Sequence, residues 1–428
     1  MVTMTSVDRV IALREHKAAE HQLTRQQAAA LQATASRLIR LEMTAGVDRY
    51  RVVAGSVVGA ANVAGVQVLV RPKIPLRNLL YLLGAGYDDI RWWEETFPYD
   101  REQELLPAFL AFFTRSLQRA LSVGLLRTYQ WEEERLPTIR GRLDFSKLLR
   151  RPGHDLPIAC RYEEFTADNL LNRYLRAAVR RAFFVPDIPP ALRRILQAEL
   201  ARFEEVQDTA VRIDALDDYV YTRLDDHYRT PLALARMLLA GGTIADRRGS
   251  TGAGTFAIDM NRLFENFVAE RLRRYLAPEL VLQREPVTAL DVDRRVRTKP
   301  DVVLRRSGGG VVHVADVKYK LSGSGFARNP DYYQLLAYAT VTKQSEGTLI
   351  YHDAGGDDSL PTRIEVRNSP VALSTYRLDL RGDPREVEQQ LLALADWLLE
   401  RVDLCAGRST GTGSQRHLGR PTASESSP

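Results

Sequence analysis

The feature that most constrains the fold is the segment TKPDVVLRRSGGGVVHVADVKYK, residues 298–320. It is typical of two β-strands joined by a glycine turn. If SGGG is a four-residue turn, Arg306 pairs with Val311, and the same register makes Asp301 face Asp316. Directly opposed side chains of an antiparallel pair share a face, with Cβ atoms about 4.5–5.5 Å apart. Two carboxylates at that spacing repel unless a cation lies between them, so the hairpin predicts a site for a hard cation such as Mg²⁺.

The second strand of the hairpin also carries lysines. Because side chains alternate along a strand, Lys318 and Lys320 share the face of Asp316, while His313 and Tyr319 point the other way. A lysine beside a metal holds the attacking water or stabilises the charge that grows on a phosphoryl group. The alternative is a surface hairpin whose aspartates and lysines are solvated or joined in salt bridges.

The order of these residues resembles the PD-(D/E)XK nuclease signature, which here consists of Pro300, Asp301, Asp316 and Lys318. The resemblance implies that Asp301 and Asp316 bind the metal and that Lys318 joins them in catalysis. In the predicted helix MNRLFENFVAERL, Glu265 precedes the hairpin, where this superfamily often supplies a further metal-site carboxylate. The alternative for Glu265 is an exposed helical glutamate.

Two groups of residues flank the hairpin. In YYQLLAYA, Gln334 and Tyr338 share a helical face, like the QxxxY element of RecB-like members of the superfamily, although a tyrosine facing the core is the alternative. The basic run RRVRTK has the charge that binds phosphates without sequence preference, and ordinary solvated charge is its alternative. Its candidate DNA-contacting residues are Arg294, Arg295, Arg297 and Lys299.

A chain of 428 residues is too long for one ordinary core, so we expect an α+β multidomain protein. Helical periodicity fills its middle, and strands dominate both flanks. The capping-box pairs Thr24 with Gln27 and Asp383 with Glu386 predict two helix starts. The expected parts are a small β-rich N-terminal domain at 1–75, a mainly helical domain at 76–245, a PD-(D/E)XK (restriction-endonuclease-like) α/β/α nuclease domain at 246–405 and a disordered tail at 406–428.

Composition narrows the class of protein. Hydrophobic residues make up 45% and charged residues 27% of the chain, as in a soluble globular protein. We see no apolar run long enough to span a bilayer and no signal peptide, so we expect a cytoplasmic protein without a membrane partner. The net charge of +6 favours a polyanionic partner. Cys160 and Cys405 lack the spacing of a disulfide framework or a zinc site.

Segments along most of the chain resemble the McrC family, the nuclease subunits of McrBC systems that restrict DNA containing modified cytosine. They include VRPKIPLRNLLYLLGAGYD, GLLRTYQWEEERLPTIRGRLDF, FTADNLLNRYLRAAV, KPDVVL and ADVKYK. The resemblance implies an endonuclease that uses Mg²⁺ or Mn²⁺ and works with DNA and an AAA+ GTPase of the McrB type. The partner would recognise the modified site and bind GTP, and the N-terminal region would dock on it. No GxxxxGK[ST] phosphate-binding loop occurs in this sequence, which agrees with that division of labour.

Two other functions stay open at this point. One is a RecB-like nuclease that acts alone in repair, which would cut unmodified ends without nucleotide or partner. The other is a nuclease-fold scaffold that binds DNA or activates an NTPase without cutting. Retention of Asp301, Asp316 and Lys318 together speaks against the scaffold.

Overall fold

The computed structural model divides into two compact units, Met1–Leu263 and Phe264–Pro428. Together they form a mixed α/β multidomain chain. The structure describes residues 9–84, 105–145, 147, 157–185, 188–216, 219–246, 255–319, 329–352 and 363–411.

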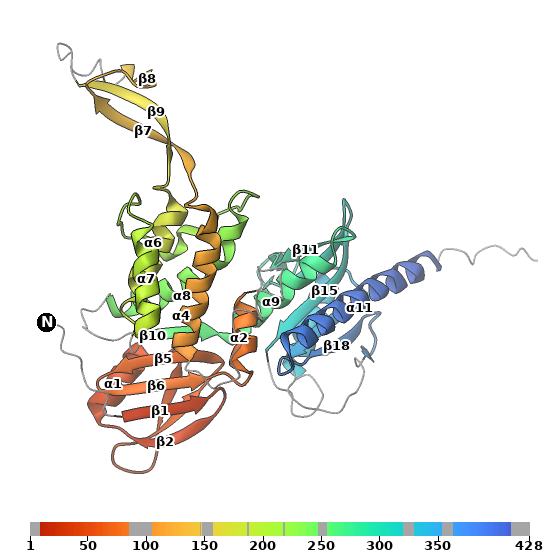
Figure 1. Ribbon diagram of the computed structural model, residues 1–428. Helices are drawn as coiled ribbons and strands as arrows, with labels where there is room; N and C mark the ends of the chain where they lie inside the picture. The colour runs from red at the N-terminus through yellow and green to blue at the C-terminus, as the bar shows by residue number, and fades with distance from the viewer. Residues whose placement is uncertain are drawn as a thin grey trace, which may run out of the picture. The chain divides into compact units, whose positions relative to one another are not determined.

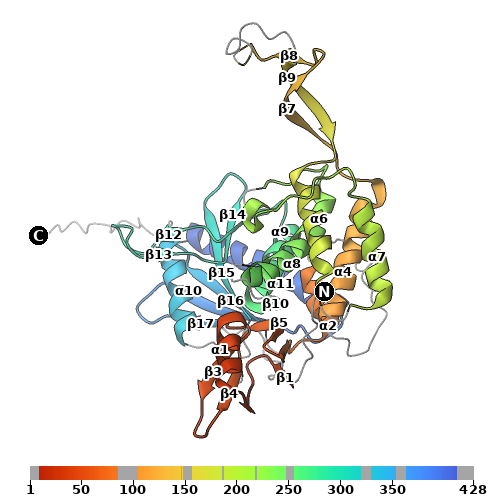
Figure 2. The ribbon, with the colours of Figure 1, turned by 90° about the vertical axis from the view of Figure 1, so that its left-hand side faces the viewer.

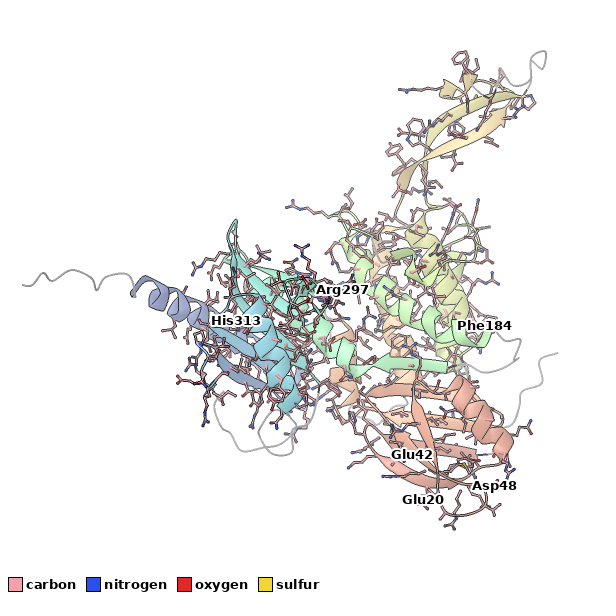
Figure 3. All side chains as sticks on the ribbon, turned by 180° about the vertical axis from the view of Figure 1, so that it is seen from behind. Glu20, Glu42, Asp48, Phe184, Arg297 and His313 are labelled. Carbon is pink, nitrogen blue, oxygen red and sulfur yellow. The ribbon has the colours of Figure 1, made fainter. Side chains whose placement is uncertain are left out.

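The first unit begins with a β-rich part, as the sequence predicts. Its main sheet has the order β1-β6-β5-β10, and a three-stranded sheet has the order β2-β4-β3 (Figure 1). Figure 3 labels three acidic side chains of the smaller sheet, Glu20 on β2, Glu42 on β3 and Asp48 in the turn before β4. The strands are β1 (Arg9–Arg14), β2 (Ala18–Gln22), β3 (Ile39–Met43), β4 (Arg49–Ala54), β5 (Val57–Val63), β6 (Val66–Arg71) and β10 (Thr255–Asp259).

Two local features of this part follow from single residues. Helix α1 (Arg25–Thr34) starts with the predicted capping box, in which Thr24 and Gln27 exchange side-chain and backbone hydrogen bonds. Gly59 on β5 has φ +149°, and a Cβ there would lie 1.9 Å from the carbonyl oxygen of Phe256 on β10. Only glycine therefore allows the two strands to approach as closely as they do.

The rest of the first unit is mainly helical. Its helices pack around buried aromatic rings such as Phe109, whose ring centroid lies 4.5 Å from that of Phe256. The helices are α2 (Leu76–Leu83), α4 (Leu105–Ala120), α6 (Leu170–Ala182), α7 (Pro190–Ala201) and α8 (Arg229–Asp246), with short 3₁₀ turns at Leu121–Val123, Ile213–Leu216 and Asp226–Tyr228.

A three-stranded sheet interrupts these helices, and the sequence analysis did not predict it. It has the order β7-β9-β8 and consists of β7 (Thr128–Leu136), β8 (Arg142–Leu143) and β9 (Ile158–Thr166). Figure 1 shows it standing out from α4 and α6, between which it lies in the chain. Aromatic side chains such as Tyr129 and Phe165 are exposed and pack on each other, with ring centroids 4.9 Å apart. The sheet therefore holds together mainly through its own pairs.

The second unit contains a mixed sheet of order β11-β14-β15-β16-β18-β17. Strands β15, β16 and β18 are parallel, and the other pairs are antiparallel. A separate two-stranded hairpin, β12 with β13, interrupts the chain between β11 and β14. The elements are α9 (Met260–Tyr275, which begins at the end of the first unit), β11 (Leu280–Arg284), β12 (Thr288–Ala289), β13 (Arg297–Thr298), β14 (Val302–Arg306), β15 (Val311–Lys318), α10 (Asn329–Val341), β16 (Glu346–His352), β17 (Arg363–Glu365), β18 (Ala372–Leu378) and α11 (Pro384–Gly411).

Helices cover both faces of this sheet. On one face, Leu335 and Tyr338 of α10 pack in a buried cluster with Val303 and Val314. On the other face, Phe264 of α9 contacts Tyr319, with ring centroids 5.8 Å apart. Helix α11 packs on the same face as α9, where Trp397 meets Tyr376 at 5.4 Å, and Figure 2 shows the strands between α10 and α11. The unit is therefore a three-layer α/β/α arrangement.

The observed boundaries differ from the predicted ones at two points. Strand β10 pairs with β5 in the first unit, so the division falls after it rather than at residue 246. The physical reason is that β10 extends the N-terminal sheet and shields its edge. Helix α11 continues to Gly411, beyond the expected start of the tail, and residues 412–428 lie outside the described part. The finer division into four parts stays a prediction.

No helix among the described residues is both long and apolar enough to cross a membrane.

Candidate functional site

The two aspartates of the hairpin come together at one end of β14 and β15. Val302 pairs with Ala315, and Asp301 and Asp316 are the next residues along the two strands, close enough for the charge of Asp301 to raise the pKa of Asp316. A hydrogen bond fixes the first carboxylate: the backbone N–H of Val317 donates to Asp301 Oδ2 at 2.8 Å. The register of the strands and the hydrogen bond from Val317 to Asp301 thus bring the two acidic side chains together.

The other end of the hairpin differs from the prediction. Arg305, not Arg306, pairs with Val311, whereas Leu304 pairs with His313. A β-bulge between Leu304 and Arg305 accounts for the difference, since it leaves one residue of β15 without a partner. Only the predicted pairing at the turn was wrong, because the bulge restores the predicted register before the strands reach the aspartates.

Asp316 lies in an unfavourable place for a carboxylate. Its side chain is 0% exposed, and neither of its oxygens has a hydrogen bond of good geometry within the described residues. Lys318 Nζ lies 2.7 Å from Asp316 Oδ2 as an ion pair. Burial first, and the charge of Asp301 next, raise the pKa of Asp316 to about 8 against the opposing effect of Lys318. The position therefore favours either a proton or a cation.

Lys318 is held charged by the same group of residues. Its side chain is 17% exposed. Burial alone would lower the pKa of Lys318, but the negative charges of Asp316 and Asp301 outweigh burial and raise it. A lysine in this state is a hydrogen-bond donor and a positive charge, not a base.

Helix α10 brings the predicted Gln334 and Tyr338 to the same face. Gln334 Nε2 donates to the Tyr338 hydroxyl at 2.5 Å, and Tyr338 is buried. Burial raises the pKa of Tyr338, and the charges of Asp316 and Lys318 also act on it. Both helical residues therefore neighbour the acidic pair.

Sequence reasoning missed a second pair at this end of the sheet. Tyr351 on β16 pairs with Lys318 on β15 in the parallel register. The hydroxyl of Tyr351 donates to Asp331 Oδ2 at 2.9 Å, and burial raises the pKa of Tyr351. Because Asp331 stands one turn before Gln334 on α10, this bond ties the helix to the strand beside Lys318. The spacing of Asp331 and Gln334 was visible in the sequence, but the register of β16 was not.

The remaining predicted residues fall in different places. Glu265 is half-buried on α9, next to Phe264, and Lys320 lies outside the described residues. Within the described residues no group of three or more His, Cys, Asp or Glu could hold a metal ion. The role of Glu265 as a third ligand stays a prediction. The four basic residues Arg294, Arg295, Arg297 and Lys299 are exposed on the β12–β13 hairpin.

The face of β15 away from Asp316 carries a buried histidine. His313 is 1% exposed, and its Nε2 lies 2.8 Å from Thr348 Oγ1 (Figure 3). Burial lowers the pKa of His313 to about 4, while the nearby charges of Glu346 and Arg401 act in opposite directions. His313 is therefore neutral at physiological pH and belongs to the packing behind the sheet.

Comparisons with known proteins agree on one family. A family model described as McrBC 5-methylcytosine restriction system component matches residues 52–352. A protein of Escherichia coli (strain K12), the type IV methyl-directed restriction enzyme EcoKMcrBC, is 21% identical over 359 residues, and the match covers 77% of this chain and 99% of that protein.

Two solved structures are similar to this chain. One is a chain of the refined half-complex from the tetradecameric assembly of Thermococcus gammatolerans McrB AAA+ hexamers with bound McrC. Its TM-score is 0.55 at 20% identity, and the match covers 90% of this chain and 100% of that one. The cryo-EM structure of the Thermococcus gammatolerans McrBC complex contains a chain with a TM-score of 0.44 at 24% identity, covering 63% and 88%. The first of these shows a shared fold.

Proposed function

Because this chain belongs to the family of McrBC 5-methylcytosine restriction system components, we propose that it is the McrC-type subunit of such a system. In this role it is a metal-dependent DNA endonuclease that works with an AAA+ GTPase of the McrB type. The observation that carries the proposal is the meeting of Asp301, Asp316 and Lys318 at one end of the α/β/α sheet. The Pro-Asp…Asp-x-Lys order of these residues supports the assignment of the second unit to the PD-(D/E)XK superfamily.

The absence of a nucleotide-binding motif supports the McrC-type rather than the McrB-type role. The sequence contains no GxxxxGK[ST] loop, so it lacks the motif with which P-loop NTPases hold nucleotide phosphates. Its similarity to a chain of the Thermococcus gammatolerans assembly covers all of that chain, and the assembly joins McrB AAA+ hexamers to McrC. A GTPase of that type is therefore the proposed partner, and GTP binding belongs to the partner.

The donor set at the site fits a hard divalent cation such as Mg²⁺ or Mn²⁺. Both groups are carboxylates, and the two oxygens of Asp316 are buried without hydrogen bonds of good geometry within the described residues. Asp301 and Asp316 would hold the ion, with Glu265 as the candidate further ligand. When bound, the ion supplies Lewis-acid activation of the phosphodiester and of water.

The protein's own side chains supply the other parts of the reaction. Lys318, positioned beside Asp316 and held charged, donates a hydrogen bond to the attacking water or to a phosphoryl oxygen and stabilises the negative charge that grows there. Asp301 keeps its orientation through the backbone N–H of Val317. Tyr338, hydrogen-bonded by Gln334, lies near enough to these charges for them to act on its hydroxyl.

The test is plasmid cleavage by the full chain with Mg²⁺ and GTP, with and without the AAA+ partner, on cytosine-methylated and unmethylated DNA. We expect cutting of the methylated plasmid only with the partner present. Asp316→Ala and Lys318→Ala each remove it, and Asp396→Asn, at an exposed position of α11, does not.

Each other outcome has a definite meaning. Cleavage by Asp316→Ala at the wild-type rate refutes the site. Cutting of unmethylated ends without partner or nucleotide replaces the proposal with a nuclease that acts alone. Stimulated GTP hydrolysis without cutting in any reaction replaces it with a non-cleaving scaffold.

A further inference from the structure

The β12–β13 hairpin is attached directly to the proposed site. It lies in the chain between β11 and β14, and its base is closed by a hydrogen bond from the Glu285 backbone N–H to the Asp301 carbonyl oxygen at 3.2 Å. The hydroxyls of Thr288 and Thr298 lie 2.6 Å apart across the two strands. The hairpin is thus anchored to the backbone of a proposed metal ligand.

The turn of the hairpin is well defined by its own hydrogen bonds. The carboxylate of Asp291 accepts hydrogen bonds from the backbone N–H groups of Arg295 and Val296, at 3.0 and 2.7 Å. The Leu290 N–H donates to the Val296 carbonyl at 2.8 Å, and Arg294 takes φ 59°. Side-chain capping of this kind stabilises a specific turn, so the arginines are presented from a defined backbone.

The acidic residues of the hairpin already form hydrogen bonds or ion pairs within it. Asp291 is bonded to the turn, Asp293 pairs with Arg295 at 3.1 Å, and Glu285 pairs with Lys299 at 2.5 Å. Two exposed arginines remain. Arg294 and Arg297 have no acidic partner within the described residues, and Figure 3 labels Arg297.

We propose that this hairpin grips the backbone of duplex DNA beside the bond to be cut, with Arg294 and Arg297 as its phosphate contacts. The inference rests on the proposed nuclease function and identifies the surface that positions its substrate. Guanidinium groups suit phosphate oxygens because their paired N–H groups match the geometry of the anion.

The distance along the chain limits where these contacts fall on DNA. Arg297 lies four residues before Asp301, so their Cα atoms are at most about 14 Å apart. One strand of duplex DNA rises about 3.4 Å per nucleotide. The Cα of Arg297 therefore lies within the rise of about four nucleotides from that of Asp301, and the Cα of Arg294, seven residues from Asp301, within the rise of about seven. Such contacts fix the register of the DNA without reading its sequence.

The test is DNA binding by the full chain, measured by fluorescence anisotropy with a labelled duplex between about 50 and 200 mM salt. The variant is Arg294→Gln with Arg297→Gln, which removes two charges from exposed positions and keeps long polar side chains. The matched control is Arg367→Gln, an exposed arginine in the turn between β17 and β18, at the opposite edge of the sheet.

We expect the double variant to bind roughly 10- to 100-fold more weakly, with the slope of log affinity against log salt reduced by about 2. The loss should be equal for methylated and unmethylated duplexes, and the control should bind like wild type. A wild-type slope in the double variant, an equal loss in the control, or a wild-type chain that does not bind DNA at about 50 mM salt overturns the proposal.

Two further measurements distinguish this proposal from a protein-contact role of the hairpin and from the proposed nuclease function. If the double variant binds DNA like wild type but no longer stimulates the AAA+ partner, the hairpin is a protein-contact surface and the proposal is overturned. Asp316→Asn tests the nuclease function independently: loss of cleavage with DNA binding retained upholds the site whatever the hairpin does.

Discussion

Replacement of Asp316 by asparagine should stabilise the metal-free protein although it removes the proposed nuclease activity. The side chain is 0% exposed, and its pKa is raised from 3.8 to about 8 by burial and by the charge of Asp301. The folded state therefore binds this proton more tightly than the unfolded state does, so stability falls as pH rises from 3.8 towards 8. Asparagine has the same shape without the charge.

The size of the gain follows from the pKa. At about pH 7 the medium is roughly three pH units above the ordinary pKa of the group, which sets an upper limit of about 4 kcal/mol. The side-chain oxygens of Asp316 are buried without hydrogen bonds of good geometry within the described residues, so the amide of asparagine would be buried there too. This offsets part of the gain, and we expect a net increase in the free energy of unfolding of roughly 1–3 kcal/mol at that pH. For a unit of this size, the midpoint of thermal unfolding should rise by roughly 3–10 °C.

The assay is thermal and urea unfolding in EDTA, followed through the transition of the second unit, with Asp396→Asn as the control at an exposed site. The gain of Asp316→Asn over wild type should be largest near pH 8 and should disappear below the ordinary pKa of 3.8, where the wild-type carboxyl is protonated in both the folded and the unfolded state. A variant that is no more stable than wild type at pH 8 would refute the reasoning that the buried charge of Asp316 lowers the free energy of unfolding.

Three further predictions concern the framework around the site. Burial lowers the pKa of His313 to about 4, while the unfolded group titrates near 6.5. The free energy of unfolding of the wild type should therefore fall by up to roughly 3 kcal/mol as pH falls from 6.5 to about 4, and the urea midpoint of His313→Gln should vary less over the same range. Gly59→Ala should lower the thermal midpoint of the first unit sharply, since its Cβ would meet the Phe256 carbonyl, whereas Gly55→Ala, with nothing within 4 Å, should not. Thr24→Ala removes one half of a capping box and should lower the free energy of unfolding, measured with denaturant, by about 1 kcal/mol.

Local signals in the sequence predicted part of the second unit, although strands β17 and β18 were not predicted. The glycine turn and the capping residues of α11 act over a few residues each, and the structure contains both. The face shared by Asp316 and Lys318 followed from alternation alone. The QxxxY pair was equally local, because two residues four apart on a helix share a side whatever the rest of the fold.

Long-range pairing was beyond such reasoning. Nothing near Thr255–Asp259 says that this strand joins β5, which lies almost two hundred residues earlier in the chain. Strand β16 pairs with β15 only after the chain has passed through helix α10, so local patterns do not give the register of the pair. The position of Tyr351 beside Lys318 was therefore not predicted. Strand β7 was missed for a different reason: its run of glutamates lacks the apolar alternation of a half-buried strand, because most of its residues are exposed.

The β-bulge of the hairpin makes the site sensitive to insertions and deletions in an uneven way. Val312 is the residue that the bulge leaves without a partner. Deleting it would place Val311 directly before His313, so that the same residues would pair in an uninterrupted ladder and the register at Asp301 and Asp316 would stay as it is. A glycine added to the SGGG turn changes no pairing. The turn and the bulge can therefore vary in length, whereas one residue inserted or deleted among Val302–Leu304 or His313–Ala315 would shift the register and turn one aspartate to the other face of the sheet.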